Sequence, residues 1–263
     1  MFQFCSLYSG SSGNCLFVET QNTKILIDAG VSLKKIEKGL ESINVDASDL
    51  SAVIVTHEHT DHIQSLGNLS KKFNLPVFAT PGTFNAMPKQ TEKISEKNKK
   101  SISINEKFSI GDIEILPFQI PHDAADPCGF TIFSDDKKIS IATDIGHMTN
   151  DVLKHIDGSE FILLESNYDS NVLKYTKYPF KLKERIAGPT GHLSNKTAGQ
   201  TINYLINSGL KKALLGHLSK ESNFPELAYQ TVMDEILSNG TNIDNFYLSV
   251  ANRDYPGKSI KIS

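Results

Sequence analysis

Four side chains that can bind a metal ion occur within six residues, directly after a short apolar stretch at residues 52–55. They are His57, His59, Asp61 and His62. In an α/β protein the carboxyl ends of the strands border the crevice in which ligands bind. Imidazole and carboxylate groups suit Zn, Mn or Fe, and a strand that runs into a turn can present such closely spaced donors to more than one ion. The run therefore predicts a metal site at the end of a strand in an α/β sheet.

Three further strands are expected to end at a residue that can bind a metal. The apolar stretches 113–118, 138–143 and 212–215 precede His122, Asp144 and His217. Each of these residues alone would be an ordinary structural side chain, but their shared placement at strand ends favours ligation. A site for two ions needs about six or seven protein ligands, one of them a bridging carboxylate. The seven candidates are enough to form such a site.

The pattern of apolar residues predicts one α/β domain spanning residues 1–263. Short strands are expected at 3–8, 15–19, 24–28, 52–55, 77–79, 113–118, 129–134, 138–143, 161–164, 212–215 and 246–251. Helices are expected at 32–43, 63–73, 150–155, 196–208 and 225–238. Residues 89–101 have no apolar period and carry five Lys against two Glu, which predicts an exposed, mobile loop.

Composition excludes several classes of protein. With 39% hydrophobic and 22% charged residues, the chain is neither collagen-like nor disordered, and its net charge of −3 gives no overall basic surface. The three cysteines form no CxxC motif, which favours packing residues in a reducing compartment over a disulfide framework. No apolar run is long enough to span a bilayer, and residues 1–10 do not resemble a signal peptide. We expect a cytoplasmic protein without a membrane partner.

The HxHxDH motif at residues 57–62, with the later His, Asp and His, resembles the metallo-β-lactamase superfamily. The resemblance implies an α/β fold of the αβ/βα four-layer sandwich type. It also implies that His57, His59 and His122 hold one ion, that Asp61, His62 and His217 hold the second, and that Asp144 bridges them. Asp28 matches an early Asp of the superfamily that supports the HxHxDH loop. The alternative is that Asp28 is a turn residue before Gly30 with no such role.

Features outside the metal ligands favour phosphodiester substrates. Residues 171–191 contain five basic residues and one acidic residue, and aromatic residues are interleaved with them. Aromatic faces can stack bases while cations follow phosphates; the alternative is a solvated loop with its aromatics in the core. Glu165, at the end of strand 161–164, can orient His192 as a general acid for a leaving alkoxide. The Gly/Ser-rich loop at residues 9–14 can cradle a phosphate.

Seven motifs in order resemble the WalJ/YycJ-type family. They are SGSSGNC at 9–15, HTDH at 59–62, HDAADPCG at 122–129, ESN at 165–167, YPF with KxRI at 178–186, GHLSN at 191–195 and GHLSK at 216–220. The resemblance implies a Mn-favoured 5′-to-3′ exonuclease acting on DNA in the bacterial cytoplasm. It makes Lys183 and Arg185 candidate contacts of the 5′-phosphate, and Ser11, Ser12, Asn14 and Asn195 candidate polar contacts. The chain departs from the family pattern at Tyr168, where a His is usual, and at Glu184, where a basic residue is usual.

These observations predict a phosphodiesterase with two divalent ions, Mn²⁺ or Zn²⁺ with Fe as a further option. Asp61 would orient the attacking hydroxide, and Glu165 with His192 would protonate the leaving group. The 72 residues between Asp144 and His217 are too few for a β-CASP insertion, so a single duplex arm or end is expected as substrate rather than a long wrapped RNA. Two alternatives stay open: a thioesterase or amidase of the glyoxalase II type, and a non-catalytic, metal-binding regulatory module. The oligomeric state does not follow from the residues.

Overall fold

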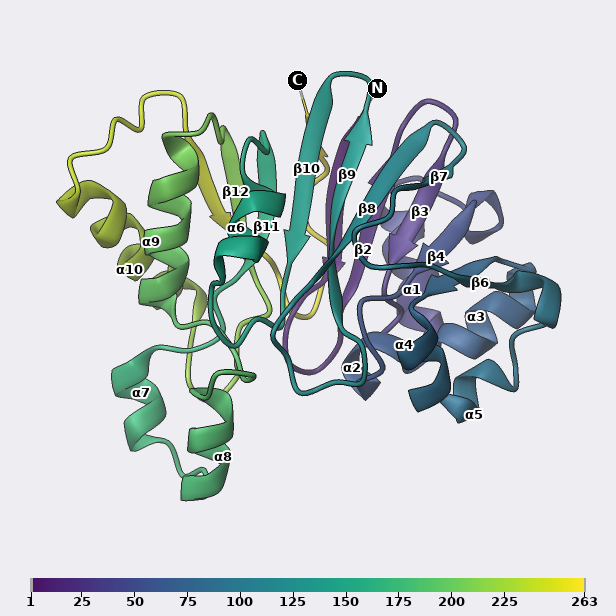
Figure 1. Ribbon diagram of the computed structural model, residues 1–263, viewed down its shortest axis with the longest axis horizontal. Coiled ribbons are helices and arrows are strands. Elements are labelled where there is room, and N and C mark those ends of the chain that lie inside the picture. Colours follow the sequence, from purple (N-terminus) through teal and green to yellow (C-terminus); the bar gives the residue numbers. More distant parts are fainter. Residues whose placement is uncertain (1, 263) are drawn as a thin grey trace. The chain divides into compact units, whose positions relative to one another are not determined.

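The computed structural model describes residues 2–262, which divide into two compact units (Figure 1). Unit 1 contains the described residues 2–119, 124–136 and 252–262, and unit 2 contains residues 120–123 and 137–251. The prediction of a single domain over residues 1–263, without a β-CASP insertion, stays a prediction.

Unit 1 contains a mixed β-sheet. Its strands, in spatial order, are β14 (Ile260–Lys261), β1 (Gln3–Tyr8), β2 (Cys15–Glu19), β3 (Lys24–Ile27), β4 (Ala52–Ile54), β5 (Val77–Ala79) and β6 (Lys99–Ser101). The strands from β14 to β3 pair antiparallel, and those from β3 to β6 pair parallel. Unit 1 also contains an antiparallel meander of β7 (Phe108–Ile110), β8 (Ile113–Gln119) and β9 (Cys128–Ser134).

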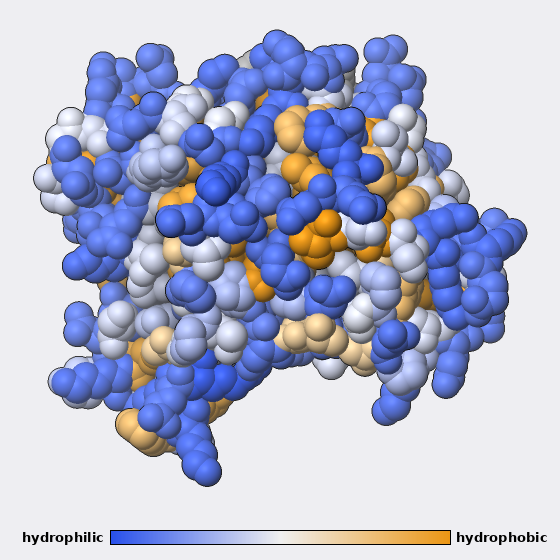
Figure 2. Space-filling model, in the orientation of Figure 1, coloured by the Kyte–Doolittle hydropathy of each residue, from blue (hydrophilic) through white to orange (hydrophobic). Residues whose placement is uncertain are grey.

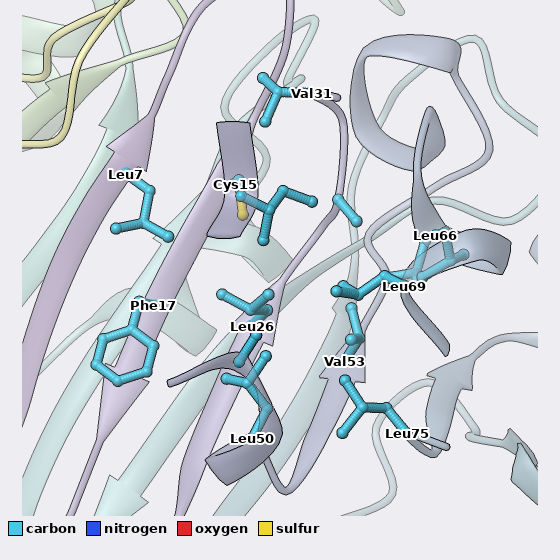
Figure 3. Close-up of a cluster of buried hydrophobic side chains, with 14 of the residues drawn as sticks. Leu7, Cys15, Phe17, Leu26, Val31, Leu50, Val53, Leu66, Leu69 and Leu75 are labelled. Atoms are coloured by element: carbon cyan, nitrogen blue, oxygen red, sulfur yellow. The ribbon is translucent and has the colours of Figure 1, made fainter. Parts of the chain in front are cut away.

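The helices of unit 1 cover an apolar core. They are α1 (Leu33–Ser42), η1 (Ala47–Asp49), α2 (Thr60–Ile63), α3 (Leu66–Phe73), α4 (Pro81–Ala86), α5 (Pro88–Thr91) and η2 (Glu96–Asn98). Ser32 caps the start of α1, and its side chain accepts a hydrogen bond from the Lys35 amide. Leu66 and Leu69 of α3 belong to the same buried cluster as Leu26 and Val53 of the sheet (Figure 3).

The helix expected at residues 63–73 begins later, at Leu66, and a separate one-turn helix precedes it. The α2 helix ends at Ile63 and α3 begins at Leu66. Between them, the carbonyl of His62 accepts a hydrogen bond from the Ala29 amide, and the Ser65 amide donates to the Ala29 carbonyl. Backbone pairing with a distant residue therefore interrupts the helical ladder directly after the metal-binding motif.

The prediction of a loop at residues 89–101 is wrong. This segment contains the end of α5, η2 and the strand β6, which pairs in parallel with β5. Ile94 is buried, and the buried Asn98 donates a side-chain hydrogen bond to Asn74. The lysines of β6 suit an edge strand, where charge discourages pairing with other chains. Two buried side chains and one strand pairing are enough to order a segment that has no apolar period.

Unit 2 is built on a parallel sheet with the strand order β13 (Tyr247–Val250), β12 (Lys212–Gly216), β11 (Phe161–Glu165) and β10 (Lys137–Ala142). Its longer helices are α6 (Asn150–Ile156), α9 (Asn195–Ile206) and α10 (Pro225–Ser238). Gly199 allows α9 to approach α10 closely, because a Cβ at this position would lie 2.7 Å from Cβ of Glu235. No helix within residues 2–262 is long and apolar enough to cross a bilayer.

Two short helices that the sequence did not predict form a hairpin in unit 2. They are α7 (Ser170–Tyr175) and α8 (Phe180–Ile186), seen at the lower left of Figure 1. Asp169 caps α7 by accepting hydrogen bonds from the Asn171 and Val172 amides. We call residues 170–186 the α7–α8 hairpin.

Candidate metal centre

The register of the parallel strands in unit 2 brings three candidate site residues to one edge of the sheet. Ala142 at the end of β10 lies opposite Leu164, and Glu165 lies opposite Gly216. Asp144 and His217 follow their strands by one or two residues, and both have left-handed backbone conformations, with φ of 59° and 54°. This conformation is uncommon for residues other than glycine, and residues that adopt it cluster at functional sites that the surrounding structure supports.

The acidic and imidazole groups at this edge lie within a few ångströms of one another. Oδ1 of Asp144 lies 3.5 Å from Nδ1 of His217 and 3.7 Å from Nε2 of His122. Oε1 of Glu165 lies 2.8 Å from Nδ1 of His192 and 2.8 Å from Nδ1 of His217. Asp144, Glu165, His192 and His217 form a group whose ligand atoms could all reach one metal ion. The parallel register thus brings together residues far apart in the chain that the sequence assigned to two roles: metal binding for Asp144 and His217, and proton transfer for Glu165 and His192.

Glu165 is held as a charged carboxylate. Its Oε2 accepts hydrogen bonds from the amides of Ile145 and Leu193 at 3.0 and 2.9 Å. Complete burial acts to raise the pKa of this group, but the neighbouring imidazoles of His192 and His217 outweigh that effect. The pKa of Glu165 therefore lies well below its ordinary value of 4.5.

A second cluster lies in unit 1, at the end of β4. Nε2 of His57 lies 3.1 Å from Nδ1 of His59, and Nε2 of His62 lies 3.6 Å from Oδ2 of Asp61. His59 precedes the first residue of α2, so the short helix returns Asp61 and His62 toward the strand end. His57 and His62 are fully buried.

Asp28 supports this second cluster, which confirms its expected role. It lies just after β3 with φ of 63° and is buried. Its Oδ1 accepts a hydrogen bond from the Thr56 amide, and its Oδ2 lies 2.8 Å from Oγ1 of Thr56 and 2.7 Å from Nδ1 of His62. The alternative of an ordinary turn Asp is therefore wrong.

Four histidines at the two clusters have the arrangement that metal ligands need. Nδ1 is held by Thr56 in His57, by Asp28 in His62, by the Gly191 carbonyl in His122 and by Glu165 in His217. Metal-binding histidines usually donate one ring nitrogen to such a group, which directs the other nitrogen at the ion. Nitrogen and carboxylate donors also suit Zn, Mn or Fe. The residues of both clusters therefore fit divalent metal ions.

The cysteines of the described residues take no part in these clusters. All three are unpaired and buried, and Sγ of Cys128 faces the backbone carbonyls of Val55 and Thr56 at 3.9 and 3.6 Å. Cys15 lies among aliphatic side chains in Figure 3. The expectation that they are packing residues is confirmed.

The candidate substrate contacts in the Gly/Ser-rich loop lie in two different environments. Ser11 and Ser12 are exposed. Asn14 is buried: its Oδ1 accepts a hydrogen bond from the Gly10 amide, and its Nδ2 lies 3.2 Å from Nε2 of His62. The loop therefore leads from solvent toward the cluster in unit 1, and its contact with a substrate stays a prediction.

The other candidate contacts lie in unit 2. Arg185 is exposed and makes a bidentate ion pair with Asp123, and Nζ of Lys183 donates to the Lys174 carbonyl at 2.7 Å. Asn195 is fully buried and exchanges hydrogen bonds with Ser166 and Asn223. A contact between Asn195 and a substrate therefore receives no support, because its amide already belongs to an internal network.

Sequence reasoning missed several residues that position the clusters. Thr56 contacts both His57 and His62, and Asn167 donates a hydrogen bond to the His217 carbonyl at 2.8 Å. Asp123 lies next to His122 and binds Arg185. The ESN motif could have pointed to Asn167, and the His-Asp pair at residues 122–123 could have pointed to Asp123. Nothing in the sequence marked Thr56.

A family model described as a β-lactamase superfamily domain matches residues 23–218. The chain belongs to the metallo-β-lactamase superfamily. Within this superfamily it is 36% identical over 237 residues to exodeoxyribonuclease WalJ of Streptococcus pneumoniae, covering 89% of this chain and 88% of that protein. It is 35% identical over 240 residues to exodeoxyribonuclease YycJ of Bacillus anthracis, covering 91% of each.

A solved structure has the same fold. The metallo-β-lactamase fold protein YhfI from Bacillus subtilis superposes with a TM-score of 0.70 at 15% identity, covering 98% of this chain and all of the other. The predicted fold class and the resemblance to the WalJ/YycJ-type family are confirmed. The chain is a superfamily hydrolase homologous to exodeoxyribonucleases, with His and Asp clusters consistent with a dinuclear metal site.

Proposed function

We propose that the protein is a metal-dependent phosphodiesterase that degrades DNA from a 5′ end. The observation that carries the proposal is the hydrogen bond of 2.8 Å between Oε1 of Glu165 and Nδ1 of His192. A carboxylate that holds one ring nitrogen makes the other nitrogen a proton donor at a defined place. His192 can therefore protonate a leaving alkoxide, which a phosphodiester releases.

In this proposal two divalent ions, Mn²⁺, Zn²⁺ or Fe²⁺, are held by the ligands expected from the motif. These are His57, His59, Asp61, His62, His122, Asp144 and His217. When bound, such ions lower the pKa of a water molecule and neutralise charge on the attacking and leaving oxygens. Asp61 orients the attacking group, Asp28 holds His62 in place, and Glu165 positions both His192 and His217.

The surroundings of His192 favour a phosphodiester over a thioester. The amide of His192 donates to the carbonyl of Ile186, the last residue of α8, so the basic segment adjoins the proton donor. The guanidinium of Arg185 also reaches Asp123, the neighbour of His122. A thioesterase for small metabolites would need neither a basic segment beside the site nor a proton donor for a thiolate. The exodeoxyribonuclease relatives support DNA as the polymer.

The test compares substrates on purified protein loaded with Mn²⁺ or Zn²⁺. We expect hydrolysis of 5′-phosphorylated DNA, slower hydrolysis of 5′-hydroxyl DNA and of RNA, and none of a lactoylthiol ester. Asp61→Ala should abolish the activity, whereas Asp254→Ala, which changes an exposed carboxylate of unit 1, should not. Hydrolysis of the thioester alone would instead identify an enzyme of the glyoxalase II type. Bound metal without turnover of any substrate would identify a regulatory module.

A further inference from the structure

We propose that the α7–α8 hairpin is a contact surface for unpaired nucleotides of the substrate strand. This inference rests on the proposed function, because it concerns the same DNA, and it adds that the strand is single-stranded where it meets the hairpin. The juxtaposition that carries it is two highly exposed aromatic rings, Tyr175 and Phe180, among exposed lysines on a hairpin whose other end bonds the His192 backbone.

The hairpin has a small core of its own, which does not include these two rings. Tyr168, Leu173 and Ile186 form a buried cluster, and Tyr178 and Leu182 pack against it. The lysine side chain of Lys183 also joins the helices by donating to the carbonyl of Lys174. Tyr168 and Tyr178 therefore stabilise the hairpin, whereas Tyr175 and Phe180 are not part of its core.

Tyr175 and Phe180 lie on the outside of the hairpin. Their exposed fractions are 80% and 73%, the highest among the large hydrophobic side chains of the described residues. Figure 2 shows hydrophobic residues among hydrophilic ones at the end of this hairpin. Exposed rings with a free face can stack on bases, and this interaction needs bases that are not already stacked in a duplex.

The charge of the hairpin itself matches a polyanion, and outside the hairpin Glu221 lines the same hollow as Tyr175. Lys174, Lys177 and Lys181 are exposed, Arg185 is exposed beside Asp123, and Glu184 is the single acidic residue of the hairpin. Nζ of Lys174 lies 5.6 Å from the centre of the Tyr175 ring. A groove or surface that combines cations with aromatic faces is the usual design for single-stranded nucleic acid. The same charges would not favour an apolar protein partner.

The hairpin is joined to the proposed chemical site within unit 2 by backbone contacts at the end of α8. The Gly191 position is open only to glycine, because a Cβ there would lie 2.1 Å from the Arg185 carbonyl. This close approach, with the hydrogen bond from the His192 amide to Ile186, seats the GHLSN loop on the end of α8. The end of α8 that carries Arg185 and Ile186 therefore lies directly against the backbone of the proposed proton donor.

The test measures binding of a fluorescent, phosphorothioate-linked dT15, which resists cleavage, to the Mn-loaded protein. We expect Tyr175→Ala and Phe180→Ala each to weaken binding about tenfold. Tyr175→Phe and Phe180→Trp should retain binding. Tyr247→Ala is the matched control, because Tyr247 is 60% exposed in the same unit but lies on β13. The affinity of the Tyr175→Ala and Phe180→Ala variants for blunt duplex DNA should fall less than threefold. Their hydrolysis of bis-p-nitrophenyl phosphate, which has no base, should equal that of wild type.

A second readout concerns the lysines. Replacing Lys174, Lys177 and Lys181 together by Gln should reduce the slope of log Kd against log salt by about 2, as expected for three lost phosphate contacts on a single strand. Unchanged dT15 binding in the Tyr175→Ala/Phe180→Ala double variant would overturn the proposal, as would an equal loss with Tyr247→Ala. If the wild-type protein cleaves no DNA but the Tyr175→Ala and Phe180→Ala variants bind dT15 more weakly than wild type, the proposed function is wrong and the proposed binding surface is supported.

Discussion

Oε1 of Glu165 accepts hydrogen bonds from Nδ1 of His192 and Nδ1 of His217, each over 2.8 Å. One buried carboxylate oxygen thus sets the orientation of a proposed proton donor and of a proposed metal ligand. Because both imidazoles present Nδ1 to it, both have Nε2 directed away from Glu165. The two functions are therefore coupled through a residue that need not touch the substrate.

Glu165→Gln should reduce kcat on DNA by about 100-fold, because an amide cannot hold both imidazoles as a charged acceptor does. The change keeps the size of the side chain and both of its terminal positions. Kinetics under saturating substrate measure the effect, and metal content measured in parallel reports on His217. Glu160→Gln, just before the same strand in an ion pair with Lys211, is the control and should have wild-type kcat. A kcat within threefold of wild type for Glu165→Gln would remove it from the proton-transfer role.

Asp28→Asn should weaken the binding of divalent metal about 10- to 100-fold, because Asp28 holds Nδ1 of His62 and both donors of Thr56. Asparagine tolerates the left-handed conformation at this position, so the substitution changes the charge and leaves the backbone unstrained. Asp135→Asn is the matched control, since Asp135 also has a positive φ, of 52°, but lies exposed in the turn after β9. Competition with a chelating dye measures both variants, and equal metal affinity for Asp28→Asn and wild type would contradict the supporting role.

The sequence was informative where chemistry and strand position coincide. The HxHxDH run, Asp144 and His217 follow short apolar strands, and the parallel register of β10, β11 and β12 places strand ends together as expected. The prediction failed where order depends on a few non-local contacts. The α7–α8 hairpin has only a five-residue core, and residues 89–101 are ordered by Ile94, Asn98 and one strand pairing. Neither produces a periodic apolar pattern.

Positioning residues were harder to find than ligands for a related reason. Thr56 and Asp123 are ordinary polar residues whose importance comes from partners 28 and 62 positions away. The left-handed conformation of His217 likewise has no local signature, because it is imposed by the strand end and by the Asn167 and Glu165 contacts. Single-residue chemistry can be recognised from sequence, but the contacts that tune it depend on the fold.

The buried thiols should make stability fall at alkaline pH. Burial raises the pKa of Cys5 from 9.0 to about 11, and it raises the pKa values of Cys15 and Cys128 further. Above pH 9 the unfolded chain therefore ionises its thiols before the folded chain does. The contribution of Cys5 to stability is complete below pH 9 and is lost as the pH rises toward 11. Urea unfolding of wild type and Cys5→Ala between pH 8 and 10.5 measures this, with a smaller decline expected for the variant. Rapid reaction of the native thiols with a disulfide reagent at pH 8 would contradict their burial.

Arg185→Ala should weaken cleavage of 5′-phosphorylated DNA about 10- to 100-fold and that of 5′-hydroxyl DNA less, because a guanidinium binds a terminal phosphate through charge-assisted hydrogen bonds. Lys181→Ala is the control, because it removes a nearby positive charge and leaves the ion pair between Arg185 and Asp123 intact. It measures how much the loss of any one charge of the hairpin weakens cleavage. The ratio of kcat/KM on the two DNA ends is the measurement. An equal loss on both would show that Arg185 acts by holding Asp123 beside His122, and would remove it from recognition of the terminal phosphate.

Adding metal to the metal-free protein should raise its Tm. An ion present at 100 times its Kd stabilises the folded state by about 2.7 kcal/mol, which for a chain of this size corresponds to roughly 5–10 °C. Differential scanning fluorimetry with Mn²⁺ or Zn²⁺ measures the shift, and elemental analysis should find two ions per chain. Asp144→Asn should lose most of the shift because its carboxylate is proposed to serve both ions, whereas Asp254→Ala should retain it. One ion per chain at saturation would contradict a two-ion site, and no shift with either metal would contradict resident metal altogether.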